Sequence, residues 1–406
     1  MTEKNSVLRR GTSSFNLMGE VAKIGQYTFQ IDEESSKSDW KYNRMSLGIN
    51  CGEECGYVYG ELMGGFSPKD TKIYAHGKDD EGHDKFDERL IIDWEDRFDD
   101  EILNTVGNRC FYRAGLKYDK NGKVVTERFL HAYDFIKYLK DNIEEGMVVS
   151  VSGDLRYSFY EGKTQIKKEV KSVYLVDEKR RDQKKYSATF KQAVLFDKDS
   201  LDIKNIDKDK SVLNINGYCV DYLRDYNGKD VKRNYPFKVD FEFPVNLSEP
   251  EKTTKLLKLL FKVKKNITEI VFEGKFIEGG TVVQATYDDL PDDVKAYVDM
   301  GIYTLEEAQA KCTVTGSRER RMLLIRPAIS NYTNEEGETV IKVQKTEDKY
   351  EEDDLDFTLP SSDEDTDDVS TYDDTSPAQP ISVDENADLM ALLASNFSLE
   401  DEDGDE

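Results

Sequence analysis

Aromatic side chains stand close to arginine or lysine in several stretches that have the alternation of β-strands. In residues 149–160, every second residue from Val149 to Phe159 is apolar or glycine and is predicted to face a core. Arg156 and Tyr160 then face outward. Because flat rings stack on nucleobases and cations pair with phosphates, this pattern predicts contact with a nucleic acid.

Three further stretches repeat the pattern. Alternation in residues 111–118 and 213–224 again separates an apolar row from an aromatic and basic row. Residues 40–44 have the same composition, although a loop is an equally good interpretation there. Lysines at 163–168 add positive charge beside Tyr160. The predicted nucleic-acid-binding residues are Trp40, Tyr42, Arg44, Phe111, Arg113, Lys117, Arg156, Tyr160, Lys163, Lys167, Lys168, Tyr218, Tyr222 and Arg224.

A purely structural interpretation of these residues stays open. Tyr and Phe are good strand formers, so part of the set is expected in the core or on an inert surface. The basic stretch from Lys163 to Lys185, taken alone, is more typical of a solvated face than of a phosphate track.

The sequence gives less support to metal binding or to catalysis. Cys51, Cys55, His76 and His83 are four candidate zinc ligands, but the glycines that flank the cysteines also fit a tight turn. The phosphate-loop, serine-elbow and HExxH motifs do not occur. We therefore expect no enzyme activity and no cofactor.

The order of predicted elements is repeated in the two halves of the chain. Each half has a hairpin with an Asn-Gly turn (Asn121-Gly122, Asn227-Gly228), then a helix, then an apolar strand with an internal glycine (Gly153, Gly274) and a Glu-Gly turn. A helix between the third and fourth strands of a five-stranded Greek-key barrel is the OB-fold arrangement. The predicted fold is mainly β, with two tandem OB-type barrels.

Domain boundaries follow from composition. The first barrel is predicted over 1–176 with an insertion at 64–108, and the second over 186–330. A basic linker at 177–185 joins them, and a polar connector at 331–350 leads into an acidic tail at 351–406. Residues 351–406 hold 21 of the 83 acidic residues and no Lys or Arg, so the tail is expected to be disordered. The first 350 residues are nearly balanced in charge.

The acidic tail suggests two roles beyond solubility. As a polyanion it could compete with DNA for basic grooves, which predicts tighter binding when residues 351–406 are deleted. Within it, residues 388–397 are apolar enough to form a short amphipathic helix against a protein partner. The predicted partner-binding residues are Leu389, Met390, Leu392, Leu393 and Phe397.

The location of the protein can also be predicted from the sequence. Five cysteines, an odd number and mostly far apart in the sequence, are typical of a reduced protein without disulfides. The first residues are polar rather than the apolar core of a signal peptide, and no apolar run reaches the ~20 residues that cross a bilayer. We expect a cytoplasmic protein, in the host cytoplasm if the protein is viral.

One part of the chain resembles the bacterial and phage single-stranded-DNA-binding protein family. The resemblance lies in residues 126–176, namely Tyr138-Leu139-Lys140, the stretch from Glu145 to Arg156, Tyr160-Glu161-Gly162-Lys163, and Glu169-Val170. It implies an OB-fold in which Arg156 and Tyr160 face the bound strand. It also implies that an acidic C-terminal tail recruits partners.

Three hypotheses follow for function. The first is a single-stranded DNA-binding protein without sequence preference, acting in DNA replication, recombination or repair and encoded by a bacteriophage. The second is a protein-interaction or structural component that uses its barrels and tail to recruit partners. The third, with the least support, is a metal-dependent enzyme that acts on nucleic acid.

Overall fold

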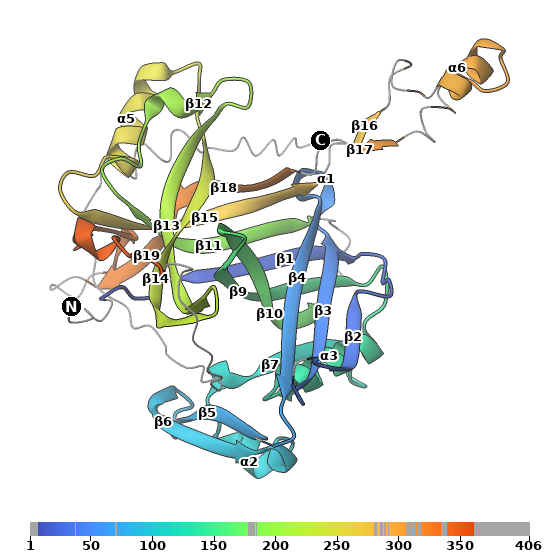
Figure 1. Ribbon diagram of the computed structural model, residues 1–406, viewed down its shortest axis with the longest axis vertical. Coiled ribbons are helices and arrows are strands. Elements are labelled where there is room, and N and C mark those ends of the chain that lie inside the picture. The colour runs from blue at the N-terminus through green and yellow to red at the C-terminus, as the bar shows by residue number, and fades with distance from the viewer. Residues whose placement is uncertain are drawn as a thin grey trace.

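The computed structural model describes residues 7–360 except 37, 70, 178–182, 184, 280–281, 285–286, 288–289, 291, 306–307, 309–312, 316–318 and 334–338. The predicted partner-binding residues 389–397 lie outside this part of the chain. The described residues form mainly β-structure, and one large sheet runs through both halves of the molecule (Figure 1). The predicted fold class is therefore confirmed.

Five strands of the first half close into a barrel. They are β1 (Ser13–Val21), β3 (Lys41–Asn50), β4 (Tyr57–Phe66), β9 (Val148–Tyr160) and β10 (Lys163–Leu175). Each is hydrogen-bonded to the next in the order β1, β3, β4, β10, β9 and back to β1. The β4–β10 pair is parallel and the others are antiparallel. Helix α3 (Ala132–Asn142) lies between the third and fourth of these strands in sequence. This is the OB-fold arrangement.

The second half repeats the same closure. Its five strands are β11 (Ser187–Phe196), β13 (Val212–Tyr226), β14 (Lys229–Pro244), β15 (Ile267–Gly279) and β18 (Glu319–Pro327). The pairs are again antiparallel except β14–β18. Helix α5 (Pro250–Phe261) lies between its third and fourth strands. Two barrels with one strand order explain the repeat seen in the sequence.

Two glycines mark equivalent positions in the barrels. A side chain at Gly153 in β9 would lie 1.9 Å from the carbonyl oxygen of Glu169 in β10. A side chain at Gly274 in β15 would lie 2.1 Å from the ring of Phe190 in β11 and 2.6 Å from the carbonyl oxygen of Leu323 in β18. In both barrels, the fourth strand needs glycine where the fifth strand approaches closely.

The two Asn-Gly hairpins are not equivalent, in contrast to the sequence-based expectation. Asn227-Gly228 joins β13 and β14, the second and third strands of its barrel. Asn121-Gly122 joins β7 (Tyr112–Tyr118) and β8 (Val124–Phe129), which belong to the excursion between β4 and α3. An Asn-Gly pair favours a tight turn in any hairpin, so it does not identify the position of that hairpin in a fold.

The excursion between β4 and α3 has a small apolar core of its own. Ile73, Ile92, Leu103, Val106 and Phe111 belong to it and are buried. The other elements of this excursion are β5 (Lys72–Lys78), β6 (Asp84–Asp93), η1 (Trp94–Asp96), α2 (Asp100–Thr105) and η2 (Asn108–Cys110).

The barrels are joined edge to edge. Residues Ser13–Met18 of β1 pair antiparallel with residues Ser187–Gln192 of β11, which makes the sheet continuous across the junction. Side chains reinforce the contact, because Lys168 of the first barrel forms an ion pair with Glu278 of the second, and both are buried. The two barrels are therefore held together by backbone pairing as well as by side chains.

Smaller elements complete the described chain. They are β2 (Phe29–Glu34), α1 (Gly52–Cys55), η3 (Ile203–Asn205), β12 (Ile206–Asp207), β16 (Val282–Gln284), α6 (Asp292–Asp299), β17 (Thr313–Thr315), β19 (Ile329–Thr333), β20 (Thr339–Val343), β21 (Lys345–Tyr350) and η5 (Glu352–Asp354). Strands β16 and β17 pair with each other, and with α6 they project from the barrels (Figure 1). The helices in the described part of the chain are all too short or too polar to span a membrane.

Candidate nucleic-acid interface

The β9–β10 hairpin carries the first group of candidate residues. Its register pairs Tyr160 with Lys163 and Arg156 with Lys167, so these four side chains share one face. The side chain of Tyr160 is 60% exposed, and both lysines are exposed. Glu161 and Gly162 have positive φ angles of 50° and 73°, which is the geometry of a tight two-residue turn. We call Tyr160, Lys163 and Lys167 the hairpin patch.

Arg156 is not part of this patch, although it was predicted to face the ligand. Its Nη1 lies 3.2 Å from Oδ1 of Asp221 in the second barrel, and its Nε lies 3.4 Å from Oε2 of Glu169. Arg10 also binds Asp221, at 3.1 Å. Because Asp221 is buried, its charge needs these cations, and the ion pair of Arg156 with Asp221 links the two barrels.

Trp40, Tyr42 and Arg44 form a second group at the tip of the β2–β3 hairpin. Tyr42 and Arg44 lie in β3, which decides between the strand and the loop that the sequence left open. The Trp40 and Tyr42 rings are stacked, with centroids 5.1 Å apart and planes inclined by 17°. Arg44 is exposed. We call these three residues the stacked patch.

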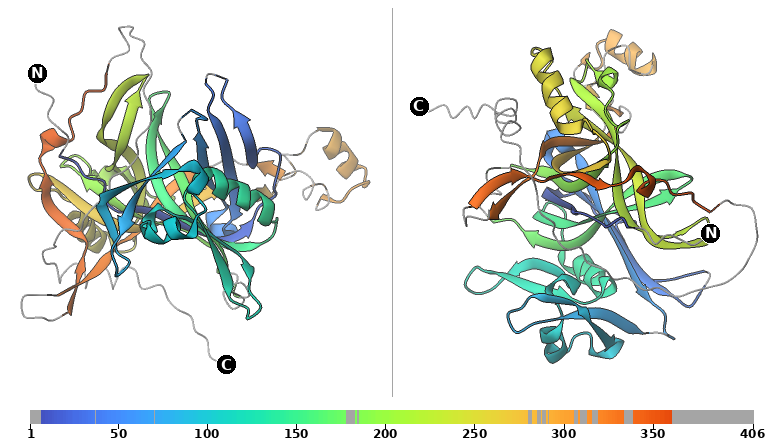
Figure 2. Two further views of the ribbon diagram at one scale, coloured as in Figure 1. Left: turned by 90° about the horizontal axis from the view of Figure 1, so that it is seen from below. Right: turned by 90° about the vertical axis from the view of Figure 1, so that its left-hand side faces the viewer.

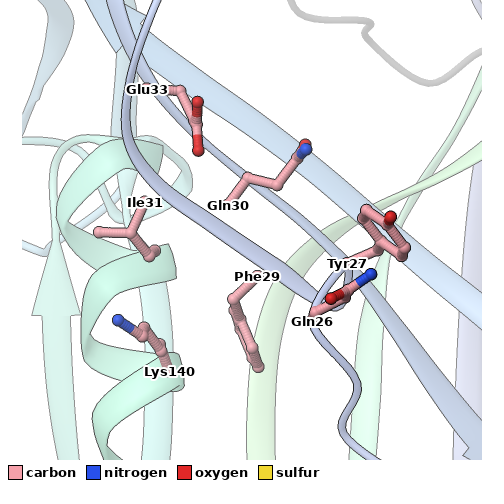
Figure 3. Close-up of a pocket in the computed structure, with 7 residues that line it drawn as sticks. All are labelled: Gln26, Tyr27, Phe29, Gln30, Ile31, Glu33 and Lys140. Carbon is pink, nitrogen blue, oxygen red and sulfur yellow. The ribbon is translucent and has the colours of Figure 1, made fainter.

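A shallow hollow beside the stacked patch contains residues that the sequence reasoning missed. It is lined by Gln26, Tyr27, Phe29, Gln30, Ile31, Glu33 and Lys140. Figure 3 shows Ile31 and Lys140 on neighbouring elements, β2 and α3. Tyr27 is 75% exposed. The alternation of Tyr27, Phe29 and Ile31 was a usable signal, but no basic residue stands beside them in the sequence, since Lys140 comes from a distant helix.

In the second barrel, Tyr222 and Arg224 face away from the core on β13. Tyr222 is 47% exposed, and Leu223 between them is buried. The same order, Tyr, inward residue, Arg, occurs at Tyr42 to Arg44 on the second strand of the first barrel. The two triplets lie at opposite ends of their strands, because Tyr42 follows the β2–β3 turn whereas Tyr222 precedes the β13–β14 turn.

Tyr218 points out of its own barrel, as predicted, but its side chain is partly buried. Alternation placed it outside the barrel, and its neighbours Cys219 and Gly217 are indeed buried. However, Tyr218 packs in a cluster with Leu355 and Phe357 of the C-terminal segment. Burial raises the pKa of its hydroxyl, and Asp197 raises that pKa further. A second layer of chain covers this face, and alternation within one strand cannot show such a layer.

Two other predicted residues are buried. Phe111 is 2% exposed and belongs to the small core of the excursion, with Arg128 and Arg113 against its ring. Lys168 is 7% exposed, and its Nζ lies 4.5 Å from the ring centroid of Phe276. Phe111 stands just before β7, where the alternation does not hold, and Lys168 faces the second barrel.

Arg113 and Lys117 on β7 lie apart from the hairpin patch. Lys117 is exposed, and Arg113 is partly buried and donates a hydrogen bond to the carbonyl of Asn108. β7 pairs with residues Ser172–Tyr174 of β10, at the opposite end of that strand from Lys163.

The candidate zinc ligands do not come together. Cys51 and Cys55 are buried in the main barrel core, whereas His76 lies in the excursion next to Asp84, with Nε2 3.0 Å from Oδ1. Among the residues that the structure describes, no three His, Cys, Asp or Glu side chains are grouped closely enough to hold a metal ion.

Cys110 and His76 are neighbours but are not arranged as a catalytic pair. The sulfur of Cys110 lies 3.3 Å from Nδ1 and 3.8 Å from Nε2 of His76. These similar distances place the sulfur against the face of the imidazole rather than in line with a nitrogen lone pair. Burial raises the pKa of the Cys110 thiol, so the reactive thiolate is disfavoured.

The hairpin patch and the stacked patch belong to the elements that frame an OB-fold binding face. The β2–β3 turn lies between the first two strands of the barrel, and the β9–β10 turn lies between the last two. In the left panel of Figure 2, the β2–β3 and β9–β10 hairpins and the β13–β14 hairpin project from the same side of the molecule. The hairpins that carry the two patches therefore extend to the same side of the molecule.

Comparisons with known proteins give a family and a distant structural similarity. A family model described as YorF matches residues 78–284. A search of curated protein sequences gives no match. Two crystal structures of the single-stranded DNA binding protein from Thermus aquaticus are similar: a deletion mutant (9% identity, 66% of this chain and 88% of that chain, TM-score 0.29) and the wild type (10%, 66% and 87%, 0.28).

Proposed function

The chain belongs to the YorF family, and we propose that it binds single-stranded DNA without sequence preference, in replication, recombination or repair. The observation that carries the proposal is the pair of hairpins on the first barrel. Each presents an exposed or partly exposed aromatic ring together with cations, and they project from the same side. Stacking and phosphate pairing are the two contacts that bind a single strand.

The chemistry of these patches favours binding that is independent of sequence. Tyrosine and tryptophan rings stack on any base, and lysine pairs with phosphate at any position. Duplex DNA keeps its bases stacked inside, so it cannot use the rings.

A competition experiment tests the proposal. Labelled oligo-dT bound to the protein is challenged with unlabelled single strands of several sequences, with the matching duplex, and with RNA of the same sequence. We expect single-stranded DNA of any sequence to displace the probe and the duplex to displace it poorly. Displacement by duplex as efficient as by single strands would contradict the proposal, and magnesium-dependent degradation of the probe would indicate an enzyme instead.

A second function, recruitment of proteins, is favoured by a different observation. Around α6, Met300 is 70% exposed and Ile302 is 59% exposed, with Tyr297 and Tyr303 beside them. These apolar side chains lie on the element that projects from the barrels (Figure 1). Exposed apolar groups on a projecting element are typical of a protein-binding site, and such recruitment is compatible with DNA binding by the barrels.

A further inference from the structure

The chain beyond the second barrel folds back over it. After β21, the cluster of Tyr350, Leu355 and Phe357 packs with Leu8, Tyr218 and Val220. An ion pair of 2.9 Å between Lys198 and Glu352 adds to this contact. The segment Glu351–Phe357 contains five acidic residues and ends in an aromatic ring, and it lies against the second strand of an OB-type barrel.

Phe357 contacts both a cation and an aromatic ring, and the planes of the Tyr235 and Phe357 rings are inclined by 43°. The guanidinium of Arg233 lies 4.3 Å from the centroid of the Phe357 ring. Tyr235, two residues along β14, has its ring centroid 5.9 Å away. Tyr235 in turn contacts Phe237 of the barrel core at 5.1 Å, so Phe357 is the outermost ring of an aromatic series. Arginine and aromatic side chains are both groups on which nucleobases stack.

One hydrogen-bond donor of Arg233 has no acceptor in this arrangement. Its Nε is buried and has no hydrogen-bond acceptor among the described residues. A buried donor without an acceptor is unfavourable, and the hydrocarbon ring of Phe357 cannot accept in its plane. A nucleobase in the same position has carbonyl oxygens or ring nitrogens that can.

We propose that Arg233 and Tyr235 form a nucleobase subsite, which Glu351–Phe357 occupies until single-stranded DNA displaces it. The carboxylates take the place of phosphates and the Phe357 ring takes the place of a base. This inference rests on the proposed function, because it concerns the same ligand. It adds a subsite that the strand patterns did not indicate, since Arg233 and Tyr235 lie on the side of β14 that turns toward the core, in register with Leu223 and Asp221.

While the segment occupies the subsite, DNA cannot bind there. The apparent affinity for DNA is therefore the affinity of the open form multiplied by the fraction of molecules in which the subsite is open. If about one molecule in ten is open, Phe357→Ala strengthens oligo-dT binding about tenfold. Arg233→Ala, combined with Phe357→Ala, reverses the gain. Phe86→Ala is a matched control, because Phe86 also lies under an arginine, Arg109 at 5.4 Å, but belongs to the excursion of the first half.

The experiment measures anisotropy of labelled oligo-dT with the full-length wild type and these variants, after far-UV circular dichroism has shown that each is folded. Tighter binding by Phe357→Ala alone, cancelled by Arg233→Ala, is the expected result. Equal or weaker binding by Phe357→Ala overturns the inference and leaves the proposed function standing. Failure of every protein, wild type included, to bind oligo-dT overturns the proposed function itself.

Hydrogen exchange of the wild type gives a second test that does not depend on a variant folding. Saturating oligo-dT should speed amide exchange in residues 351–357, because the segment leaves the barrel. Unchanged or slower exchange in these residues, under conditions where the DNA is bound, overturns the inference.

Discussion

Tyr160 stands at the tip of the β9–β10 hairpin with more than half of its surface exposed, beside Lys163. A stacked base contributes about 1–3 kcal/mol, so Tyr160→Ala should weaken oligo-dT binding by about 5- to 150-fold. Tyr160→Phe keeps the ring and should retain most of the affinity. The control is Tyr297→Ala, which removes another exposed ring (46% exposed) from α6. If the Tyr160→Ala and Tyr297→Ala proteins bind alike, the hairpin patch is not a stacking site.

Lys163 and Lys167 should contribute to DNA binding by pairing with phosphate groups. Each phosphate contact to a single strand contributes about 0.7 to the slope of log K against log salt concentration. Replacing both lysines with glutamine should therefore lower the slope by about 1.4. Lys258→Gln, an exposed lysine on α5, should leave the slope unchanged. A slope that stays the same in the double variant would remove these lysines from the interface.

His131 should make stability depend on pH in the acid range. Its side chain caps α3 by accepting a hydrogen bond from the backbone N–H of Tyr133 at 3.2 Å, and burial lowers its pKa from 6.5 to about 4. The folded protein disfavours the charged imidazole of His131. The contribution of His131 to the free energy of unfolding is therefore fully present above pH 6.5 and is lost as pH falls toward 4. The loss is roughly 3 kcal/mol.

His131→Asn keeps a capping side chain but cannot gain a proton. Urea unfolding at pH 7 and at pH 4.5 compares the two proteins. The wild type should lose more stability between these pH values than the variant. Equal losses would show that His131 is not the titrating group.

At the scale of elements, alternation predicted strand faces well and predicted accessibility poorly. The rows Val149 to Phe159 and Leu213 to Leu223 do face a core. Tyr218 and Lys168 also point out of their own barrels, but other parts of the chain cover them. Periodicity predicts on which side of a strand a residue lies. Whether another segment covers that side depends on contacts between residues far apart in sequence. The repeat of glycines and helices was informative because each barrel closes in the same way.

The buried ion pair between the barrels gives a test at this scale. Lys168→Met leaves Glu278 buried without its partner, which should cost about 3–5 kcal/mol of unfolding free energy. Replacing both residues with methionine should recover most of that loss. Lys275→Met breaks the exposed pair with Glu54 and should cost under about 1 kcal/mol. Chemical denaturation measures all three, and equal costs at Lys168 and Lys275 would contradict a buried role for Lys168.

At the scale of the whole molecule, charge is divided between the two ends of the chain. Residues 361–406 carry 16 acidic side chains and no Lys or Arg, whereas residues 1–350 are nearly neutral. Ending the chain at Pro360 retains the Phe357 contact and removes this charge. We expect affinity for oligo-dT to rise several-fold at low salt and the salt dependence to steepen. Equal affinities of the two chains at low salt would show that the tail does not compete with DNA.

The central claim is that exposed rings on the barrels stack on bases. Titration of the full-length protein with oligo-dT, followed by intrinsic tyrosine and tryptophan fluorescence at two salt concentrations, tests it most directly. The account predicts saturable quenching at both concentrations, with weaker binding at the higher one. An emission that oligo-dT leaves unchanged at low salt would contradict it.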